Sequence, residues 1–219
     1  MIVKNYINYT LPSLKTTDTV EDALEIMAEF KLNSLVLVSD GLVLAVISEK
    51  MIEHLPEEME IGNFPIMHQE ELVFEESVPF FESLKLVSVS DKDAAAVIDA
   101  SQQYLGTVTK LDLFQKLVDG LSLHSDGGLI EIKLKDNTYS LSEISRLIEQ
   151  EHAHILSMFL FNHDDVEKSI LMKVDAPQIS FIVHSLERFG YEVVSYFSTE
   201  HVGNLEKDRF DLLMKYLSI

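Results

Sequence analysis

The sequence predicts an α/β protein made of two similar repeats, followed by a third unit with a different order of elements. Two segments of about 60 residues show the order strand, helix, strand, strand, helix, and such internal similarity indicates a tandem duplication. A small, polar, glycine-ended stretch at 121–128 separates these repeats from the rest of the chain. Beyond it, the order strand, helix, strand, strand, helix, strand predicts a split βαβ sandwich with an antiparallel sheet.

The first repeat begins with an extended lead and an amphipathic helix. Apolar residues spaced by three and four from Val20 to Phe30 give this helix one apolar face, and Asp18 or Thr17 is its expected cap. Ser48 opens a second helix after two buried-type strands. The predicted elements are a lead at 14–17, a helix to 30, strands at 35–38 and 43–47, and a helix from 48 to about 55.

The second repeat follows the same order. Glu76 or Ser77, together with Pro79, is expected to start its first helix. Its last strand contains Gly106 and leads directly into a helix. The predicted elements are a lead at 72–74, a helix carrying Phe80, Phe81 and Leu84, strands at 94–98 and 105–108, and a helix at 110–118.

The segment 104–112 carries the clearest candidate for binding chemistry. Gly106 has no Cβ, so a backbone or a ligand can approach it closely. Thr109 and Asp112 are residue types that cap helices, three positions apart at a helix entry, where free N–H groups favour an anion. Such an entry can hold a phosphate while the aspartate accepts from a sugar hydroxyl. The alternative is a glycine turn followed by a capped helix that binds nothing.

The third unit alternates strands and helices in the βαββαβ order. We expect Ser140 or Ser142 to cap its first helix and Gly190 to end its second. The predicted elements are a strand at 130–134, a helix through 141–148, strands at 155–161 and 169–174, a helix at 178–189, and a strand at 192–196. The segment 200–219 is predicted to form a further helix, capped by Asn204.

The composition narrows the classes of partner. The 219 residues include 37 acidic and 17 basic side chains, a formal net charge of −20, which argues against nucleic acid or an acidic membrane surface as the main partner. A small anionic ligand remains an option where backbone donors and Lys110 override that field. No apolar run approaches a membrane span, no signal-peptide core is evident, and there is no cysteine. We therefore expect a cytoplasmic protein.

The sequence gives little support for catalysis or metal binding. His152 and His154 are two apart, and His163 follows one strand later, but two alternating residues of an extended segment point to opposite faces. Surface histidines are the preferred interpretation, and no metal is expected. The sequence contains no nucleophile elbow, P-loop, dinucleotide fingerprint or His-Glu-x-x-His motif. We therefore expect no enzyme activity.

The tandem repeat resembles a pair of CBS domains, known as a Bateman module, over roughly residues 1–120. The resemblance depends on DTVEDAL at 18–24, VID at 97–99 and GTVTKLD at 106–112. The last stretch matches the family pattern of Gly, two variable residues, Ser or Thr, two further residues, and Asp. In that family this segment binds the ribose and phosphates of adenosine ligands. The resemblance thus implies AMP, ADP, ATP or S-adenosylmethionine as an effector rather than an obligatory cofactor.

Carried over residue by residue, the resemblance places Thr109 at a phosphate or ribose and Asp112 at ribose hydroxyls. The first repeat departs from the pattern, with Ala45 in place of the glycine and Met51 in place of the aspartate. We therefore expect at most one adenosine-type site per module, built mainly by the second repeat. The candidate ligand-binding residues are Gly106, Thr107, Thr109, Lys110, Asp112 and Ser48.

The third unit resembles an ACT domain over roughly residues 128–198. The similarity lies in the element order, in SEIS at 142–145 and in LERFGYEV at 186–193. ACT domains commonly bind amino acids or related metabolites and pair sheets between subunits. Their first loop usually carries a glycine, which the loop containing Asp136, Asn137 and Thr138 lacks. Dimerisation is therefore the preferred role for this domain, with the loop kept as a candidate site.

A CBS pair followed by an ACT domain resembles the acetoin utilisation B-like group of regulatory proteins in its architecture. We therefore expect a non-enzymatic homodimer that senses an adenosine nucleotide through the CBS pair and acts on an unknown downstream protein. The alternative is a ligand-free scaffold that only dimerises. The predicted segments are CBS repeat 1 at 1–62, CBS repeat 2 at 63–122, an ACT-like domain at 127–198, and a C-terminal helix at 199–219.

Overall fold

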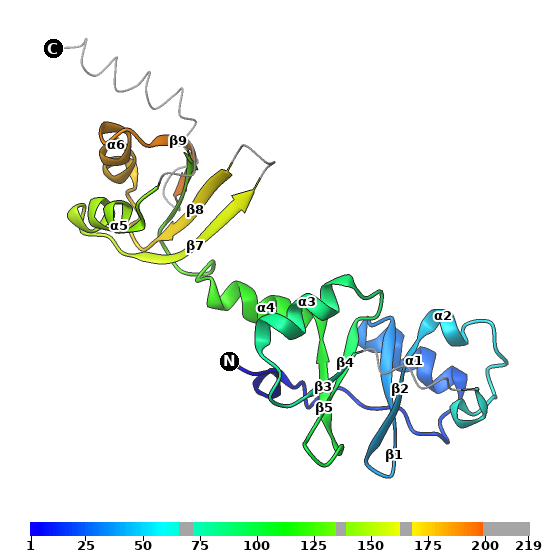
Figure 1. The fold of residues 1–219 in the computed structure, drawn as a ribbon. Helices are drawn as coiled ribbons and strands as arrows, with labels where there is room; N and C mark the ends of the chain where they lie inside the picture. Colours follow the sequence, from blue (N-terminus) through cyan, green and yellow to red (C-terminus); the bar gives the residue numbers. More distant parts are fainter. Residues whose placement is uncertain (66–71, 135–138, 163–167, 199–219) are drawn as a thin grey trace. The chain divides into compact units, whose positions relative to one another are not determined.

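A computed structural model of the chain describes residues 1–65, 72–134, 139–162 and 168–198. The chain divides into two compact units, Met1–Leu117 and Val118–Ile219 (Figure 1). The N-terminal unit buries two hydrophobic clusters and the C-terminal unit buries one. This is the mixed α/β class that the sequence predicts, while the four predicted segment boundaries remain predictions.

The first repeat forms a two-stranded antiparallel sheet, with α1 before it and α2 after it in the chain. The predicted lead strand at 14–17 is reduced to an isolated bridge between Leu14 and Leu37. Helix α1 begins with Thr19 as its N-cap, not with Asp18 or Thr17 as predicted, because Thr19 forms a reciprocal capping box with Asp22. The predicted helix from Ser48 to about residue 55 is too long. The elements are η1 (Val3–Tyr6), α1 (Val20–Phe30), β1 (Ser34–Ser39), β2 (Leu42–Ser48), α2 (Glu49–Ile52) and η2 (Ile61–Asn63).

The second repeat forms a three-stranded sheet in the order β3-β4-β5, with the β3–β4 pair parallel and the β4–β5 pair antiparallel. Pro79 is the N-cap residue of α3, so the predicted start at Glu76 or Ser77 is wrong. The lead adds a parallel strand, as the repeat order predicts. The elements are β3 (Val73–Glu75), α3 (Phe80–Val89), β4 (Ala94–Ile98), β5 (Tyr104–Thr109) and α4 (Lys110–Gly120).

The two repeats pack together through the beginnings of β1 and β4. The Asn33 N–H donates to Asp93 Oδ2 (3.2 Å), and the Asp93 N–H donates to Asn33 Oδ1 (2.9 Å). Ser34 Oγ accepts from the N–H groups of Asp93 and Ala94. One apolar cluster also joins Val36 of the first repeat to side chains of the second. These contacts hold the first repeat against the side of the second repeat that lines the candidate site.

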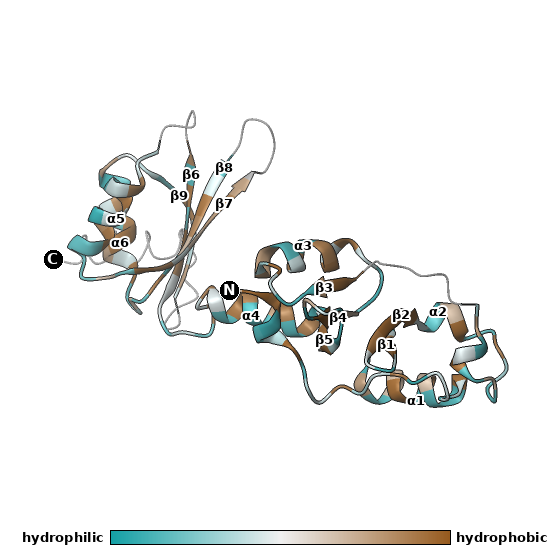
Figure 2. Ribbon diagram, turned by 60° about the horizontal axis from the view of Figure 1, so that its bottom comes forward, coloured by the Kyte–Doolittle hydropathy of each residue, from teal (hydrophilic) through white to brown (hydrophobic). Residues whose placement is uncertain are grey.

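The C-terminal unit is a four-stranded antiparallel sheet in the order β7-β8-β6-β9, with two helices over one face (Figure 1). Its buried apolar residues form one cluster between the sheet and the helices, and the brown inner faces of α5 and α6 in Figure 2 reflect this. This arrangement confirms the predicted βαββαβ sandwich. The elements are β6 (Gly128–Leu134), α5 (Leu141–Gln150), β7 (Ile155–Asn162), β8 (Lys168–Val174), α6 (Ser180–Arg188) and β9 (Glu192–Ser198).

Local signals explain both helices of this unit. Ser140 is the N-cap of α5, and its Oγ accepts from the Glu143 N–H. Gly190 adopts φ +88° directly after α6, a conformation that glycine accepts at no steric cost. The candidate loop residues Asp136, Asn137 and Thr138, the histidine at 163, and the predicted helix at 199–219 lie outside the described residues. No helix among the described residues has the length and apolar character to cross a membrane.

Candidate functional site

The entry of α4 is closed by a reciprocal capping box between Thr109 and Asp112. Asp112 Oδ2 accepts from the Thr109 N–H (3.1 Å) and from Thr109 Oγ1 (2.6 Å), and the Asp112 N–H donates back to Thr109 Oγ1 (3.0 Å). The same geometry caps α1 through Thr19 and Asp22. The capped helix that the sequence predicts is therefore present. The Asp112 carboxylate lies at the helix entry where the sequence predicts that an anion can bind.

Asn8 contacts this capping box from the opposite end of the N-terminal unit. Its Nδ2 donates to Asp112 Oδ1 (3.2 Å) and Oδ2 (3.4 Å). Its Oδ1 accepts from Thr10 Oγ1 (2.7 Å) and from the Thr10 N–H, which turns the amide nitrogen toward Asp112. The Asn8 N–H donates to Thr107 O (2.8 Å), so an isolated bridge to β5 holds this segment in register.

Asn8 was not among the site residues predicted from the sequence. The spacing of Asn8 and Thr10 is a local signal for an Asx-type turn, but it carries no information about a contact with Asp112. Long-range pairing of the N-terminal segment 1–11 with β5 creates that contact.

Lys110 lies at the first position of α4 and is anchored by the protein. Its Nζ donates to Ser90 O (2.7 Å) and lies 3.7 Å from Asp93 Oδ1. Its backbone N–H donates to Asp93 O (2.9 Å). Two of the amide groups at this helix entry, those of Lys110 and Asp112, therefore already have protein acceptors.

A cavity of about 510 Å³ opens beside this helix entry. Three of the predicted site residues line it, namely Thr109, Lys110 and Asp112. The remaining polar wall comes from Asn8, Thr10, Lys31 and Asp93. The apolar wall includes Phe30, Leu111 and Phe114. The cavity is thus lined by the N-terminal segment 1–11, by the end of α1 and by the entry of α4.

The other three predicted residues do not line this cavity. A Cβ on Gly106 would lie 2.3 Å from Ile7 Cγ2, so the close approach to this glycine is made by Ile7. Thr107 is buried, and its Oγ1 shares a hydrogen bond with the Tyr104 hydroxyl (2.7 Å). Burial raises the pKa of Tyr104, although this hydrogen bond acts in the opposite direction. Ser48 is buried at the start of α2 without a side-chain capping bond.

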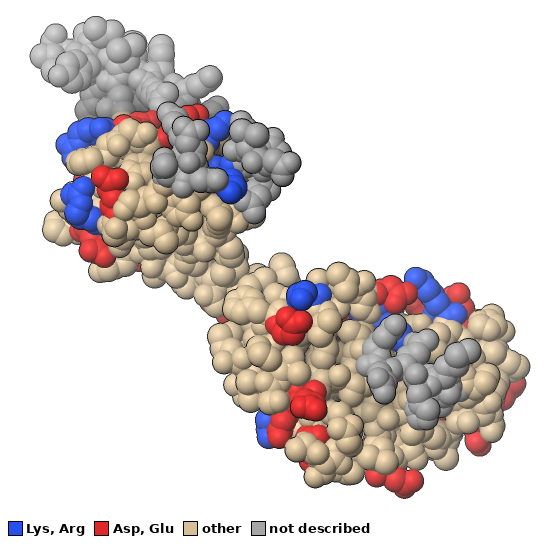
Figure 3. Space-filling view, in the orientation of Figure 1, with Lys and Arg blue, Asp and Glu red and all other residues tan. Residues whose placement is uncertain are grey.

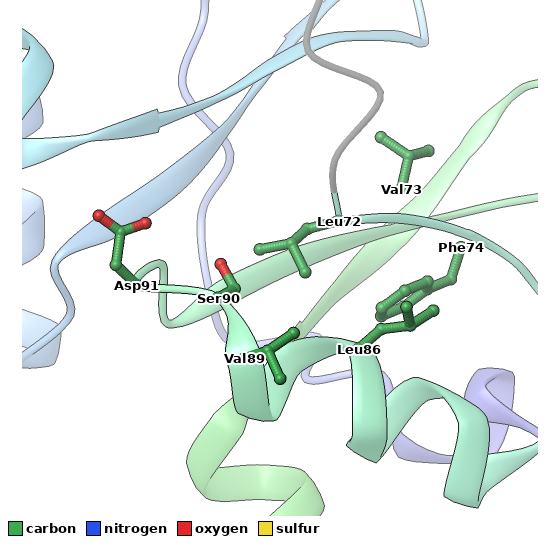
Figure 4. Close-up of a pocket in the computed structure, with 7 residues that line it drawn as sticks. All are labelled: Leu72, Val73, Phe74, Leu86, Val89, Ser90 and Asp91. Carbon is green, nitrogen blue, oxygen red and sulfur yellow. The ribbon is translucent and has the colours of Figure 1, made fainter.

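A second cavity, of about 570 Å³, lies between β3 and α3 (Figure 4). Phe74 and Leu86 lie close together on its wall, whereas Val73 points away from the helix. Its polar residues are Ser90 and Asp91, at the end of α3. It contains none of the predicted site residues, and Ser90 and Asp91 are its polar lining residues, so it offers fewer polar contacts to a ligand than the cavity at Asp112.

The described residues form no single dominant charged patch on the face that Figure 3 shows. On the face of the N-terminal unit visible in Figure 3, acidic side chains form several small, separate groups. No group of three or more metal-ligating side chains converges among the residues that the structure describes. The pair of His154 and Asp175 is mostly exposed; hydrogen bonding to the His154 N–H and then to its ring lowers the pKa of Asp175.

Comparison with known proteins gives a family match for the first repeat. The CBS domain family model matches residues 3–56, a range that contains all of the helices and strands from η1 to α2. Similar solved structures include a CBS domain pair/ACT domain protein from Thermotoga maritima, which is 20% identical, with 55% of this chain and 99% of that chain covered and a TM-score of 0.49.

Two further solved structures are similar at the same level. CBS domains of a transcriptional regulator from Streptococcus pneumoniae are 18% identical, with 52% of this chain and 98% of that chain covered and a TM-score of 0.47. CBSX2 in complex with AMP is 20% identical, with 54% of this chain and 96% of that chain covered and a TM-score of 0.44; CBSX2 is from Arabidopsis thaliana.

Proposed function

We propose that this chain, in which a CBS domain pair precedes an ACT-like domain, is a non-enzymatic regulatory protein that binds an adenosine nucleotide in the cavity at Asp112. The observation that supports this proposal is the position of the Asp112 carboxylate. It lies on the cavity wall, fixed by Thr109 at the end of β5 and by Asn8 from the N-terminal segment 1–11. A fixed acceptor on a concave, mostly apolar surface is the usual form of a small-molecule site.

The hydrogen-bonding capacity of Asp112 leaves room for a ligand hydroxyl. Its Oδ2 accepts from both donors of Thr109, whereas Oδ1 accepts from Asn8 alone among the described residues. A carboxylate has about four lone-pair sites, so Oδ1 can accept one further hydrogen bond. A ribose hydroxyl is a suitable donor, because a hydrogen bond to a charged acceptor is stronger than one between neutral groups.

The apolar wall suits a nucleobase. Leu111 and Phe114 line the cavity and are 61% and 57% exposed, although large apolar side chains are usually buried. A flat aromatic base placed against them would remove apolar surface from water and stack on the Phe114 ring. The same helix turn therefore provides both a polar and an apolar contact for a nucleoside.

Calorimetric titration with AMP tests this proposal, using a matched pair of variants. Asp112→Ala removes the carboxylate from the cavity, and Asp22→Ala removes the equivalent capping carboxylate from α1, outside the cavity. Both variants lose the carboxylate half of a capping box, but only Asp112→Ala should lose AMP affinity. Equal affinity of the two variants would contradict the assignment of the ribose contact to Asp112.

A homodimer is the second part of the proposal, and the exposed apolar side chains of the second repeat support it. Phe81 and Val89 of α3, which do not line the cavity at Asp112, are 65% and 84% exposed. Such side chains favour a protein contact.

If the CBS pair binds no nucleotide, the exposed side chains of Phe81 and Val89 support a dimerising scaffold instead. Light scattering of Phe81→Ser and Val89→Ser would detect loss of a dimer, and purified wild-type protein with no excess absorbance at 260 nm would favour the scaffold.

A further inference from the structure

We propose that the cavity at Asp112 selects nucleosides and nucleoside monophosphates over triphosphates, and that Lys31 is the residue that recognises the single phosphate. This inference rests on the proposed nucleotide site and adds its specificity. Four charged side chains line the cavity, two lysines and two aspartates: Lys31, Lys110, Asp93 and Asp112. Their formal charges cancel, so the cavity offers no excess positive charge to a polyphosphate.

The ammonium group of Lys110 and two N–H groups at the α4 entry, which could otherwise bind a further phosphate, already have partners within the protein. Lys110 Nζ is held by Ser90 O and lies beside Asp93, which neutralises its charge locally. The N–H groups of Lys110 and Asp112 donate to Asp93 O and Thr109 Oγ1. A phosphate at the α4 entry would have to displace these contacts and would also face the negative charge of Asp112.

Lys31 differs from Lys110, because its ammonium group has no hydrogen-bond or ion-pair partner among the described residues, and the side chain is exposed at the cavity. It follows α1 in the left-handed conformation (φ 55°), and its backbone N–H donates to Ala28 O and Met27 O, which ends the helix there. The backbone of Lys31 is thus fixed, whereas its charge is available to a ligand. One available ammonium group matches one phosphate.

The charge of the whole chain acts in the same direction. With a formal net charge of −20, the protein repels a ligand more strongly as the ligand gains phosphates. A local cation offsets this repulsion for one phosphate only. We therefore expect AMP to bind more tightly than adenosine, and ATP more weakly than AMP.

The test is a titration series with adenosine, AMP, ADP and ATP at one ionic strength, without divalent cations. For the wild-type chain we expect AMP to bind about fivefold more tightly than adenosine, the effect of one partly exposed ion pair. Lys31→Gln should remove this difference and leave adenosine affinity unchanged, and Lys31→Arg should restore it. Lys85→Gln, at an exposed lysine of α3 that does not line the cavity, is the matched control and should have no effect.

The outcomes separate this inference from the function on which it rests. ATP binding as tightly as AMP, with both lost in Asp112→Ala, would overturn the charge selection and leave the nucleotide site in place. An unchanged preference for AMP in Lys31→Gln would overturn the role of Lys31. No binding by any of the four compounds would overturn the proposed site together with its specificity.

Discussion

The side-chain amide of Asn8 donates to the carboxylate of Asp112, 104 positions later in the chain. This bond joins the N-terminal segment 1–11 to the first turn of α4, the last helix of the second repeat. Because Thr10 fixes the orientation of the amide and Thr109 fixes the carboxylate, both partners are oriented before any ligand arrives. The wall of the cavity is therefore preorganised by groups from both ends of the N-terminal unit.

A double-mutant cycle tests this connection. Asn8→Ala removes the bond to Asp112 but leaves the capping box, and we expect it to lower the free energy of unfolding by about 1 kcal/mol. Asp112→Asn keeps the size of the side chain and removes its charge. The double variant should be less destabilised than the sum of the single variants, by roughly 0.5 kcal/mol or more, in urea unfolding followed by circular dichroism. Strict additivity would show that the two residues are not coupled.

The two capping boxes differ in burial, so their removal should differ in cost. Thr109→Ala and Thr19→Ala each delete a cap worth about 0.5–2 kcal/mol. Thr109 is buried, and its loss also leaves the Asp112 carboxylate with fewer donors in a partly buried place. We expect the larger decrease in unfolding free energy for Thr109→Ala. Serine variants, which keep the hydroxyl, are the controls, and equal losses at the two sites would contradict the difference in burial.

Gly106 is predicted to be intolerant of a side chain because of Ile7. An added Cβ would lie 2.3 Å from Ile7 Cγ2, and overpacking of this kind costs about 1–3 kcal/mol. In a background with Ile7→Ala, which removes Cγ2, Gly106→Ala should cost less. Thermal unfolding of the four proteins measures this rescue. If Gly106→Ala is equally harmful in both backgrounds, backbone conformation rather than contact with Ile7 requires the glycine.

The C-terminal unit should lose stability at high pH through Tyr191. Burial first, and then the hydrogen bond to Glu143 and its negative charge, raise the pKa of Tyr191 to about 12. The folded chain thus keeps a proton that the unfolded chain releases above the ordinary pKa of 10.0. The free energy of unfolding should therefore fall as the pH rises from about 10 to about 12.

Urea unfolding of the wild-type chain and of Tyr191→Phe at several pH values across this range measures the contribution. The phenylalanine variant, which has no proton to release at this position, should show a smaller decrease. Glu143→Gln removes the carboxylate but keeps the burial of the ring, so it should retain part of the decrease. Identical pH dependence in Tyr191→Phe and wild type would exclude a contribution from Tyr191.

Residues that act on close neighbours in the chain were mostly predicted. Thr109 and Asp112 were recognised as a capping pair because a capping box depends on residues three positions apart. Ser140 was one of two caps expected for α5, and Gly190 was the expected end of α6. Errors of a few residues arose where neighbouring residues have similar capping propensities. The cap of α1, for example, was predicted at Asp18 or Thr17 but is Thr19.

Contacts between distant segments could not be predicted in the same way. Gly106 was expected to allow a close approach, but only the fold shows that Ile7 makes it. Asn8 and Lys31 were not recognised as parts of the candidate site, and Ser48 and Thr107 were included although they do not line the cavity. In each case the missing information is how the segment 1–11 and the end of α1 are placed against β5 and α4.

The sequence by itself determined the duplication, the order of elements apart from the lead strand of the first repeat, and the residues that cap α4, because periodicity and capping act within a few residues along the chain. Only the tertiary structure decided that Asn8, Lys31, Asp93 and Asp112 share one cavity. Their proximity depends on strand pairing and packing between segments far apart in the chain. A shift of one residue in such pairing moves a side chain to the other face of a strand, so local sequence cannot specify the site without the fold.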